Sequence, residues 1–302
     1  MIAGSAYAQS LSVTKQEKIK MTEEAENWID DMPEGLQDKL SDAVAHAMRG
    51  FSAEADYFRI SKDSLKNIPG LPGLQGKIFK GKEKTGKKPI LIYFHGGGWS
   101  LGSVESTAKF CQALANDGHV TVVSLEYPLA PENPYPAALD YCVAAVEKIV
   151  KNSKELGSDP SLISLGGDGA GGNLALETYE KLPSSIKIRS LVLYYPLLQT
   201  TGALNPDTKR KYGRGYGFDS RLWEICVEAY QGHSTGYTKK LPPTLLISAG
   251  RDIVIDQQRS FAKKGVTYVE FEGSLHGFIA DGHQATAFNK AVELTDKFLQ
   301  QK

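Results

Sequence analysis

Short apolar runs of strand length alternate along most of this chain with segments whose apolar residues recur at helical spacing. The runs are rich in Val, Ile and Leu and predict strands at 89–94, 120–125, 162–165, 190–195, 244–248 and 268–271. The segments between them predict helices at 103–116, 136–151, 173–181 and 284–301. Apolar strands that alternate with helices are typical of a mostly parallel sheet covered on both faces, so the pattern predicts an α/β fold.

Two parts of the chain depart from this alternation. Residues 15–50 show helical spacing on both sides of a break near Pro33, which predicts two amphipathic helices. Residues 197–240 contain no strand pattern, only a polar, glycine-rich loop and one predicted helix at 220–231. We expect both parts to form a small helical cap over the carboxyl edge of the sheet, where open α/β sheets bind ligands. Residues 15–302 would then form a single domain.

An antiparallel edge is expected before the first parallel strand. Residues 57–60 and 75–80 predict a pair of strands there. The segment 68–73 between them is rich in proline and glycine, and we interpret it as a turn-rich loop.

The composition excludes several classes of function. Lys plus Arg and Asp plus Glu each number 35, so the net charge is zero and nothing favours nucleic acid or an anionic membrane surface. The apolar runs are too short to span a membrane. The three cysteines, Cys111, Cys142 and Cys226, form no metal-spaced cluster, so we expect buried free thiols, no metal site and no cofactor.

Residues 1–14 are expected to lie outside the fold. The small-residue stretch around Ala6-Tyr7-Ala8 resembles a signal-peptide cleavage site, although no charged and apolar regions precede it. A flexible tail and the remnant of a secretion signal are both open interpretations. The first corresponds to a cytoplasmic protein and the second to a secreted or periplasmic one.

The stretch Gly167-Asp168-Gly169-Ala170-Gly171-Gly172 lies between a predicted strand and a predicted helix. This is the context of a nucleophile elbow, in which the pattern G-x-S-x-G places a serine at the tip of a sharp turn. Gly169 occupies that tip here, and glycine tolerates the positive φ that the tip requires. The sequence therefore predicts an intact elbow without its hydroxyl. We expect Asp168, one residue away, to point away from the pocket.

A second glycine cluster, His95-Gly96-Gly97-Gly98-Trp99, follows the strand predicted at 89–94. Successive glycines leave backbone N–H groups accessible to a substrate. Such a loop can form an oxyanion hole together with the N–H of the residue after the tip, here Ala170. The elbow later in the chain favours this interpretation over a plain glycine turn.

An acid and a histidine follow two later strands. Asp252 comes after the strand predicted at 244–248, and His276 after the one at 268–271. Tip, acid and histidine stand in the chain order of an α/β-hydrolase triad, in which the acid fixes the imidazole tautomer and the imidazole is the general base. Asp256 is an alternative acid.

Together with Tyr127-Pro128-Leu129-Ala130-Pro131-Glu132, these motifs resemble those of the hormone-sensitive-lipase-like family of α/β-hydrolases. Bacterial carboxylesterases and acetyl esterases belong to that family, and the similarity extends from about Tyr57 to the C-terminus. The resemblance implies an α/β-hydrolase fold with a helical cap. It also implies a set of site positions: the nucleophile at Gly169, oxyanion donors at Gly97 and Gly98, the acid Asp252 and the base His276.

Two features depart from the family pattern. Ile253-Val254 follows the acid where the family usually has Pro-Leu, which is a minor change. Gly169, by contrast, removes the attacking oxygen. The first hypothesis is a short-chain esterase scaffold disabled by an engineered or natural Ser-to-Gly replacement. The second is a non-catalytic small-molecule binding protein. Plant gibberellin receptors resemble this family and use the same fold to bind a ligand. A third, weaker hypothesis is that His276 activates a water molecule held in the space that the missing seryl side chain leaves.

Four aromatic residues are candidates for the walls of the substrate pocket: Trp99, Tyr127, Phe218 and Phe278, with Trp223 as a further one. Packing in the core explains these aromatic residues equally well. The expected partner is a small-molecule ester, with no nucleic acid and no integral membrane association, and a homodimer is allowed.

Overall fold

The computed structural model of the chain describes residues 16–21, 35–36, 39, 42, 66–81, 87–116, 119–199, 204–232, 236–262, 266–280 and 284–301. The strands are β1 (Gln16–Lys20), β2 (Asn67–Ile68), β3 (Leu71–Phe79), β4 (Ile90–Phe94), β5 (Thr121–Leu125), β6 (Ile163–Asp168), β7 (Leu191–Tyr194), β8 (Thr244–Arg251) and β9 (Thr267–Leu275). The helices are α4 (Ala108–Asn116), α5 (Ala137–Lys151), α6 (Ala170–Lys181), α7 (Pro206–Tyr212), α8 (Ser220–Tyr230), α9 (Ile255–Ala262) and α10 (Ala285–Gln300). Over the described ranges, the strands form one sheet in the order β1-β9-β8-β7-β6-β4-β5-β3-β2.

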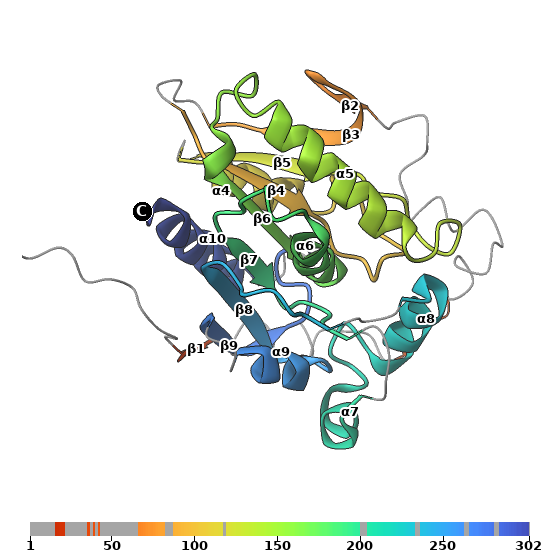
Figure 1. Cartoon of the computed structure of the whole chain (residues 1–302). Coiled ribbons are helices and arrows are strands. Elements are labelled where there is room, and N and C mark those ends of the chain that lie inside the picture. The colour runs from red at the N-terminus through yellow and green to blue at the C-terminus, as the bar shows by residue number, and fades with distance from the viewer. Residues whose placement is uncertain are drawn as a thin grey trace, which may run out of the picture.

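Helices cover both faces of this sheet (Figure 1). Helices α5 and α6 pack on one face, and α4 and α10 pack on the other. The strand β4 shows how one apolar run serves both layers. Ile92 and Phe94 belong to the cluster under α5 and α6, whereas Leu91 and Tyr93 belong to the cluster under α4 and α10. Successive side chains of a strand point to opposite faces, so a continuous apolar run is what a doubly covered sheet requires. The predicted α/β fold, a mostly parallel sheet with helices on both faces, is confirmed.

The parallel strands bring the predicted motifs to one edge of the sheet. Phe94 at the end of β4 pairs with Gly167 of β6, and Asp168 pairs with Tyr194 at the end of β7. Strands β7, β8 and β9 continue in the same direction. The carboxyl ends of β4, β6, β8 and β9 therefore share an edge, and the loops that follow these strands meet there.

Residues 16–20 form strand β1, and the helix predicted at the start of 15–50 is wrong there. The strand runs parallel to β9, with Lys18 opposite Glu270. Lys18 also forms ion pairs with Glu270 at 3.5 Å and Glu272 at 3.1 Å. Residues 16–20 adopt an extended conformation because they pair with the backbone at the edge of β9 and with these carboxylates. The local sequence pattern does not reveal this pairing. Later in 15–50, the N–H of Lys39 donates to the carbonyl of Gly35 at 3.2 Å, which is a helical hydrogen bond.

A hairpin replaces the loop predicted at 68–73. Strand β2 ends at Ile68, and β3 begins at Leu71 after a turn at Pro69-Gly70, where Gly70 has a φ of +79°. Leu71 is fully buried, which explains why the strand begins within the proline- and glycine-rich segment. The strand predicted at 75–80 is found as part of β3, which pairs antiparallel with β5. The strand predicted at 57–60 and the tail 1–14 lie outside the described residues.

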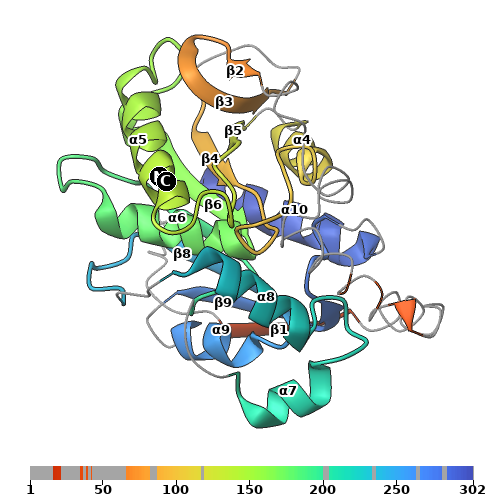
Figure 2. The same cartoon turned by 90° about the vertical axis from the view of Figure 1, so that its right-hand side faces the viewer.

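Two helices, where one was predicted, lie in the described part of 197–240. Helix α8 matches the prediction, whereas α7 was missed. Helix α7 begins at the N-cap Asn205, whose side chain accepts the N–H groups of Asp207 at 2.9 Å and Thr208 at 3.4 Å. Pro206 in the first turn needs no hydrogen-bond donor, so the Asn-Pro pair that we interpreted as loop starts a helix. Helix α9 was also missed. Figure 2 shows α7 and α8 together on the same side of the molecule as α9.

Candidate active site

The turn between β6 and α6 has the geometry of a nucleophile elbow, with Gly169 at its tip. Gly169 has a φ of +52° and a ψ of −117°, so the predicted positive φ is found. Its N–H donates to the carbonyl of Tyr194 at 3.0 Å, and its carbonyl accepts the N–H of Leu197 at 3.0 Å. Helix α6 begins at Ala170, directly after the tip and earlier than the predicted 173. The first N–H groups of a helix have no partner inside it, so that of Ala170 is available to a substrate.

Close packing requires glycine at the positions around the tip, but it does not require glycine at the tip itself. A Cβ at Gly167 would lie 2.5 Å from the carbonyl oxygen of Phe94, and a Cβ at Gly171 would collide with the same oxygen. A Cβ at Gly169 would meet no heavy atom closer than Nε2 of His276, at 3.4 Å. The space at position 169 therefore accommodates a side chain, and that side chain would point at the imidazole.

The glycine loop after β4 borders the tip. Gly97 has a φ of +117° and Gly98 a φ of +59°, and both line the pocket. The carbonyl of Gly97 accepts the N–H groups of Ser100 at 3.1 Å and Leu101 at 2.8 Å, which closes the loop into a turn. The structure brings Gly97, Gly98 and Ala170 around one pocket, as an oxyanion hole requires.

The structure brings Asp252 to His276. Oδ2 of Asp252 lies 2.8 Å from Nδ1 of His276. Asp252 is buried, and it also accepts the N–H of Val254 at 3.0 Å and Nε2–H of Gln258 at 3.2 Å. A carboxylate that accepts from Nδ1–H leaves Nε2 as the basic nitrogen, which faces Gly169. The alternative acid, Asp256, instead accepts a hydrogen bond from the hydroxyl of Thr208 on α7.

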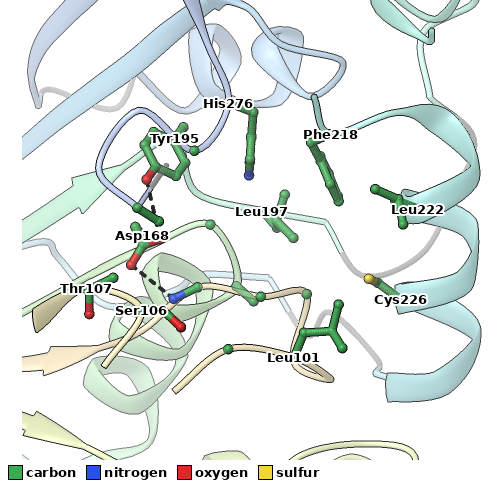
Figure 3. A pocket seen from close by; sticks show the side chains of 18 residues that line it. Leu101, Ser106, Thr107, Asp168, Tyr195, Leu197, Phe218, Leu222, Cys226 and His276 are labelled. Carbon is green, nitrogen blue, oxygen red and sulfur yellow. Dashed lines mark hydrogen bonds between the residues drawn. The ribbon is translucent and has the colours of Figure 1, made fainter. Parts of the chain in front are cut away.

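A pocket with a volume of about 270 Å³ opens above the tip (Figure 3). Its walls include Phe218, whose ring stacks on His276 with a centroid distance of 4.5 Å and an interplanar angle of 27°. Phe218, Leu222 and Cys226 are spaced by four residues and present one face of α8 and of the turn before it to the pocket (Figure 3). That spacing is the sequence signal that could have identified Leu222 and Cys226. Leu101 and Leu197 complete the apolar wall without such a signal.

Three of the four predicted pocket aromatics point into the core. Trp99 stacks on Tyr230 at a centroid distance of 4.5 Å, and Tyr127 stacks on His95 at 4.3 Å. Phe278 packs against Phe271 at 5.3 Å. Of the four, the pocket lining includes Phe218 alone. Nearness to a motif in the sequence does not determine the direction of a side chain. An aromatic ring stabilises the fold more when it is fully buried in the core than when it lines an open pocket. The further candidate, Trp223, is buried too and lies outside the lining.

Asp168 lines the pocket, contrary to the expectation that it points away. Its carboxylate accepts hydrogen bonds from the hydroxyl of Tyr93 at 2.8 Å, the N–H of Gly96 at 3.0 Å and the hydroxyl of Tyr195 at 3.4 Å. Tyr195 in turn accepts the N–H of Ile279 at 3.3 Å. Asp168 therefore ties the elbow to the glycine loop and, through Tyr195, to the loop that carries His276. Burial raises the pKa of Asp168, and the hydrogen bonds oppose that shift.

Burial makes Cys226 an unsuitable nucleophile. It lines the pocket, but burial raises the pKa of its thiol to about 12. The thiolate is the nucleophilic form of cysteine, and almost none of it is present near neutral pH at that pKa.

A Gly98→Ala substitution is expected to disturb the contact between the glycine loop and α8. The new Cβ would collide with Sγ of Cys226 and would also sit at a positive φ. We expect a loss of about 2–4 kcal/mol in the free energy of unfolding, from backbone strain and overpacking together. Gly157→Ala is the matched control, because its φ is +78° and nothing lies within 4 Å of the new Cβ. Chemical denaturation of both variants is the measurement, and equal losses would contradict the predicted collision.

A buried polar cluster lies one helical turn beyond the tip. Asn173 accepts Nε1–H of Trp99 at 3.2 Å and donates to Oε1 of Glu177 at 3.4 Å and the hydroxyl of Tyr237 at 3.3 Å. Oε2 of Glu177 and the hydroxyl of Tyr230 are buried without a hydrogen-bond partner in the described part of the chain. Burial raises the pKa of Glu177 from 4.5 to about 7, and the bond from Asn173 opposes the shift.

Glu177→Gln is expected to remove part of the pH dependence of stability. The folded-state pKa of Glu177 is above its unfolded value, so the folded state binds this proton more tightly. The free energy of unfolding should therefore fall as the pH rises from 4.5 to about 7, by at most about 3 kcal/mol. We expect the Gln variant to melt at a higher temperature than the parent above that range and at a similar temperature below it.

Thermal unfolding across the pH range measures this effect. Glu228→Gln, at an exposed position of α8, controls for the loss of one negative charge. Parallel pH profiles for the parent and Glu177→Gln would show that Glu177 is ionised in the folded state at low cost.

The described residues show neither a membrane-spanning helix nor a metal site. No helix among them is long and apolar enough to cross a membrane. They contain no group of three or more His, Cys, Asp or Glu side chains arranged to hold a metal ion. Cys111, Cys142 and Cys226 are buried free thiols, as predicted.

Known proteins share this architecture. Carboxylesterase NlhH of Mycobacterium tuberculosis is 47% identical over 87 residues, which span 29% of this chain and 27% of that esterase. Carboxylic ester hydrolase LipN of the same organism is 28% identical over 274 residues, which span 78% of this chain and 68% of LipN. The structure of a hyperthermophilic esterase from the archaeon Pyrobaculum calidifontis superimposes with a TM-score of 0.70 at 24% identity, over 90% of this chain and 94% of that one.

The family assignment rests on a match longer than that to NlhH. A family model described as alpha/beta hydrolase fold matches residues 91–280. This range begins in β4 and includes the glycine loop, the elbow, Asp252 and His276. It covers more than half of the 302 residues, and the chain belongs to the alpha/beta hydrolase fold family.

Proposed function

We propose that the chain is a carboxylic ester hydrolase scaffold for short-chain esters, disabled at the position of its nucleophile. One observation carries this proposal: a Cβ at residue 169 would lie 3.4 Å from Nε2 of His276. A serine at that position would bring its hydroxyl within hydrogen-bond reach of the imidazole. The carboxylesterases among the similar proteins support the same reaction class.

The roles of the site residues follow from acyl transfer. With serine at the tip, Oγ would attack the ester carbonyl while Nε2 of His276 takes its proton. Asp252 would hold the imidazole tautomer and stabilise the imidazolium. The N–H groups of Gly97, Gly98 and Ala170 would bind the oxyanion, and water would then release the acyl group. Gly169 removes the first of these steps and leaves the others in place.

We assign the role of a cap to 15–50 and 197–240, with the exception of β1. Phe218 packs on His276 and Cys226 packs against Gly98, so the insertion covers the proposed site. Arg221 of α8 forms an ion pair with Asp42, which joins the two predicted parts of the cap. An apolar wall on this side suits a small, uncharged ester.

A non-catalytic small-molecule binding protein is the second candidate function. The pocket at the tip favours it, because the lining residues are in place although Gly169 supplies no nucleophile. A buried apolar pocket without a nucleophile is suited to ligand binding. In that case a serine at the tip would not produce efficient turnover.

Hydrolysis of chromogenic short-chain esters separates the two functions. The chain and its Gly169→Ser variant are assayed side by side with acetyl, butyryl and longer acyl esters. A large gain in rate supports the disabled esterase, whereas a folded but inactive serine variant supports the binding protein.

A further inference from the structure

We propose that the chain with Gly169 hydrolyses aryl esters directly, with a water molecule in the place of the seryl oxygen and His276 as its general base. The inference rests on the proposed function, because it requires that an ester binds in the pocket. It goes beyond that function by assigning an activity to the chain without a nucleophile. The expected product is the free acid, formed without an acyl-enzyme.

The surroundings of the tip provide the position for this water. Outside residues 168–170, the heavy atoms nearest to the site of a Cβ on residue 169 are Nε2 and Cε1 of His276, at 3.4 and 3.9 Å, and Cα of Gly96, at 4.0 Å. None is in the range of a steric collision, so the space beyond the Cβ position, between the glycine loop and the imidazole, admits a water oxygen in van der Waals contact with Cα of Gly169. Such an oxygen stands farther from Cα than a Cβ would, and a place near that of a seryl oxygen brings it within the roughly 2.6–3.2 Å of Nε2 at which a general base acts. The oxygen of the pocket water and the oxygen of a serine would therefore approach the carbonyl from the same side.

The base is oriented without help from a serine. Asp252 holds Nδ1 at 2.8 Å and is itself held by Val254 and Gln258. Two rings flank the imidazole: Phe218 stacks on it at a centroid distance of 4.5 Å, and Tyr195 lies at 4.7 Å. These contacts leave Nε2 as the nitrogen that faces the pocket.

The reaction balances without a further reactant. The water oxygen bonds to the carbonyl carbon, one water proton moves to Nε2 of His276, and the carbonyl π electrons move to oxygen. The N–H groups of Gly97, Gly98 and Ala170 stabilise that oxyanion. On collapse, the bond between the carbonyl carbon and the alcohol oxygen breaks, and the departing oxygen takes the proton from the imidazolium. Acid and alcohol are released, and the histidine is neutral again.

The mechanism selects for good leaving groups. Neutral water is a weaker nucleophile than an activated serine, and no covalent intermediate divides the barrier into two smaller ones. Esters of phenols, whose ring stabilises the negative charge that develops on the departing oxygen, are therefore the substrate class, and alkyl esters are not expected to react measurably. The pocket volume of about 270 Å³ favours short acyl groups on such esters.

The parent chain and two variants, Gly169→Ala and Gly169→Ser, test the inference. Alanine places a methyl group 3.4 Å from Nε2, which excludes a water molecule from the space beside it, and supplies no hydroxyl. We expect 4-nitrophenyl acetate hydrolysis to be fastest in Gly169→Ser and slowest in Gly169→Ala, with the parent about 10²-fold faster than the alanine variant. Alanine and serine share the strain of a positive φ, so a folded Gly169→Ser variant is the folding control for Gly169→Ala.

Two further readouts identify the mechanism. His276→Ala should reduce the rate of the parent to that of Gly169→Ala. Phenylmethylsulfonyl fluoride, which modifies an activated serine, should inactivate Gly169→Ser and leave the parent unchanged.

Each other result overturns one of the two proposals. Equal rates for the parent and Gly169→Ala, an unchanged rate after His276→Ala, or sensitivity of the parent to the sulfonyl fluoride would overturn water activation. If the parent and both variants fold and Gly169→Ser is also inactive, the proposed ester hydrolase scaffold itself is wrong.

Discussion

The Gly169→Ser variant is expected to hydrolyse short-chain esters at least about 10³-fold faster than the parent chain, because the substitution supplies the nucleophile that the proposed acyl transfer requires. The seryl side chain enters a space bounded by Nε2 of His276 at 3.4 Å from its Cβ. Its positive φ costs about 1–2 kcal/mol of folding free energy, which a 302-residue domain tolerates. Steady-state kinetics on an acyl series from acetate upward measure the gain.

A burst of phenol release at high enzyme concentration should accompany this gain, since it reports an acyl-enzyme. Thermal unfolding of the parent and the variant controls for loss of fold. A Gly169→Ser variant that is folded, binds esters and shows no gain over the parent would rule out the disabled esterase and favour the binding protein.

The second large effect is expected from Asp252→Asn in the Gly169→Ser background. The amide group places a donor or a weaker acceptor at 2.8 Å from Nδ1, so the imidazole loses both its tautomer and the stabilisation of its charged form. We expect kcat to fall by about 10⁴-fold with little change in KM. The pH–rate profile should change its shape as well, since a merely structural defect would lower the rate by a similar factor at every pH.

Asp256→Asn is the matched control for this substitution. Asp256 lies one helical turn away and bonds to Thr208 rather than to His276. In the same Gly169→Ser background, its replacement should leave kcat within a few-fold. If Asp256→Asn has the larger effect, the acid has been assigned to the wrong residue.

The positions of the motifs could be predicted from the sequence because strand pattern and chain order determine them. A parallel sheet brings the ends of β4, β6, β8 and β9 to one edge, so four loops far apart in the sequence must meet. Glycine spacing then predicted the elbow, and the structure shows the positive φ at Gly169.

Directions of side chains and long-range pairings could not be predicted in the same way. Trp99 and Tyr127 flank motifs but turn into the core, because stacking on Tyr230 and His95 buries them fully. Strand β1 is extended because it pairs with β9, which lies about 250 residues away in the sequence. The local spacing of apolar residues does not reveal such a distant partner. Asp168 lines the pocket because three donors from different elements converge on it.

Helix α8 and the turn before it contact both sides of the catalytic arrangement: Phe218 lies on the base and Cys226 against the glycine loop. The same surface forms the wall against which an acyl group would lie. A replacement there that enlarges the pocket also removes a support of His276 or of Gly98. Selectivity and turnover are thus coupled through one helix, so directed evolution toward bulkier substrates should require compensating changes in the loops after β4 and β9.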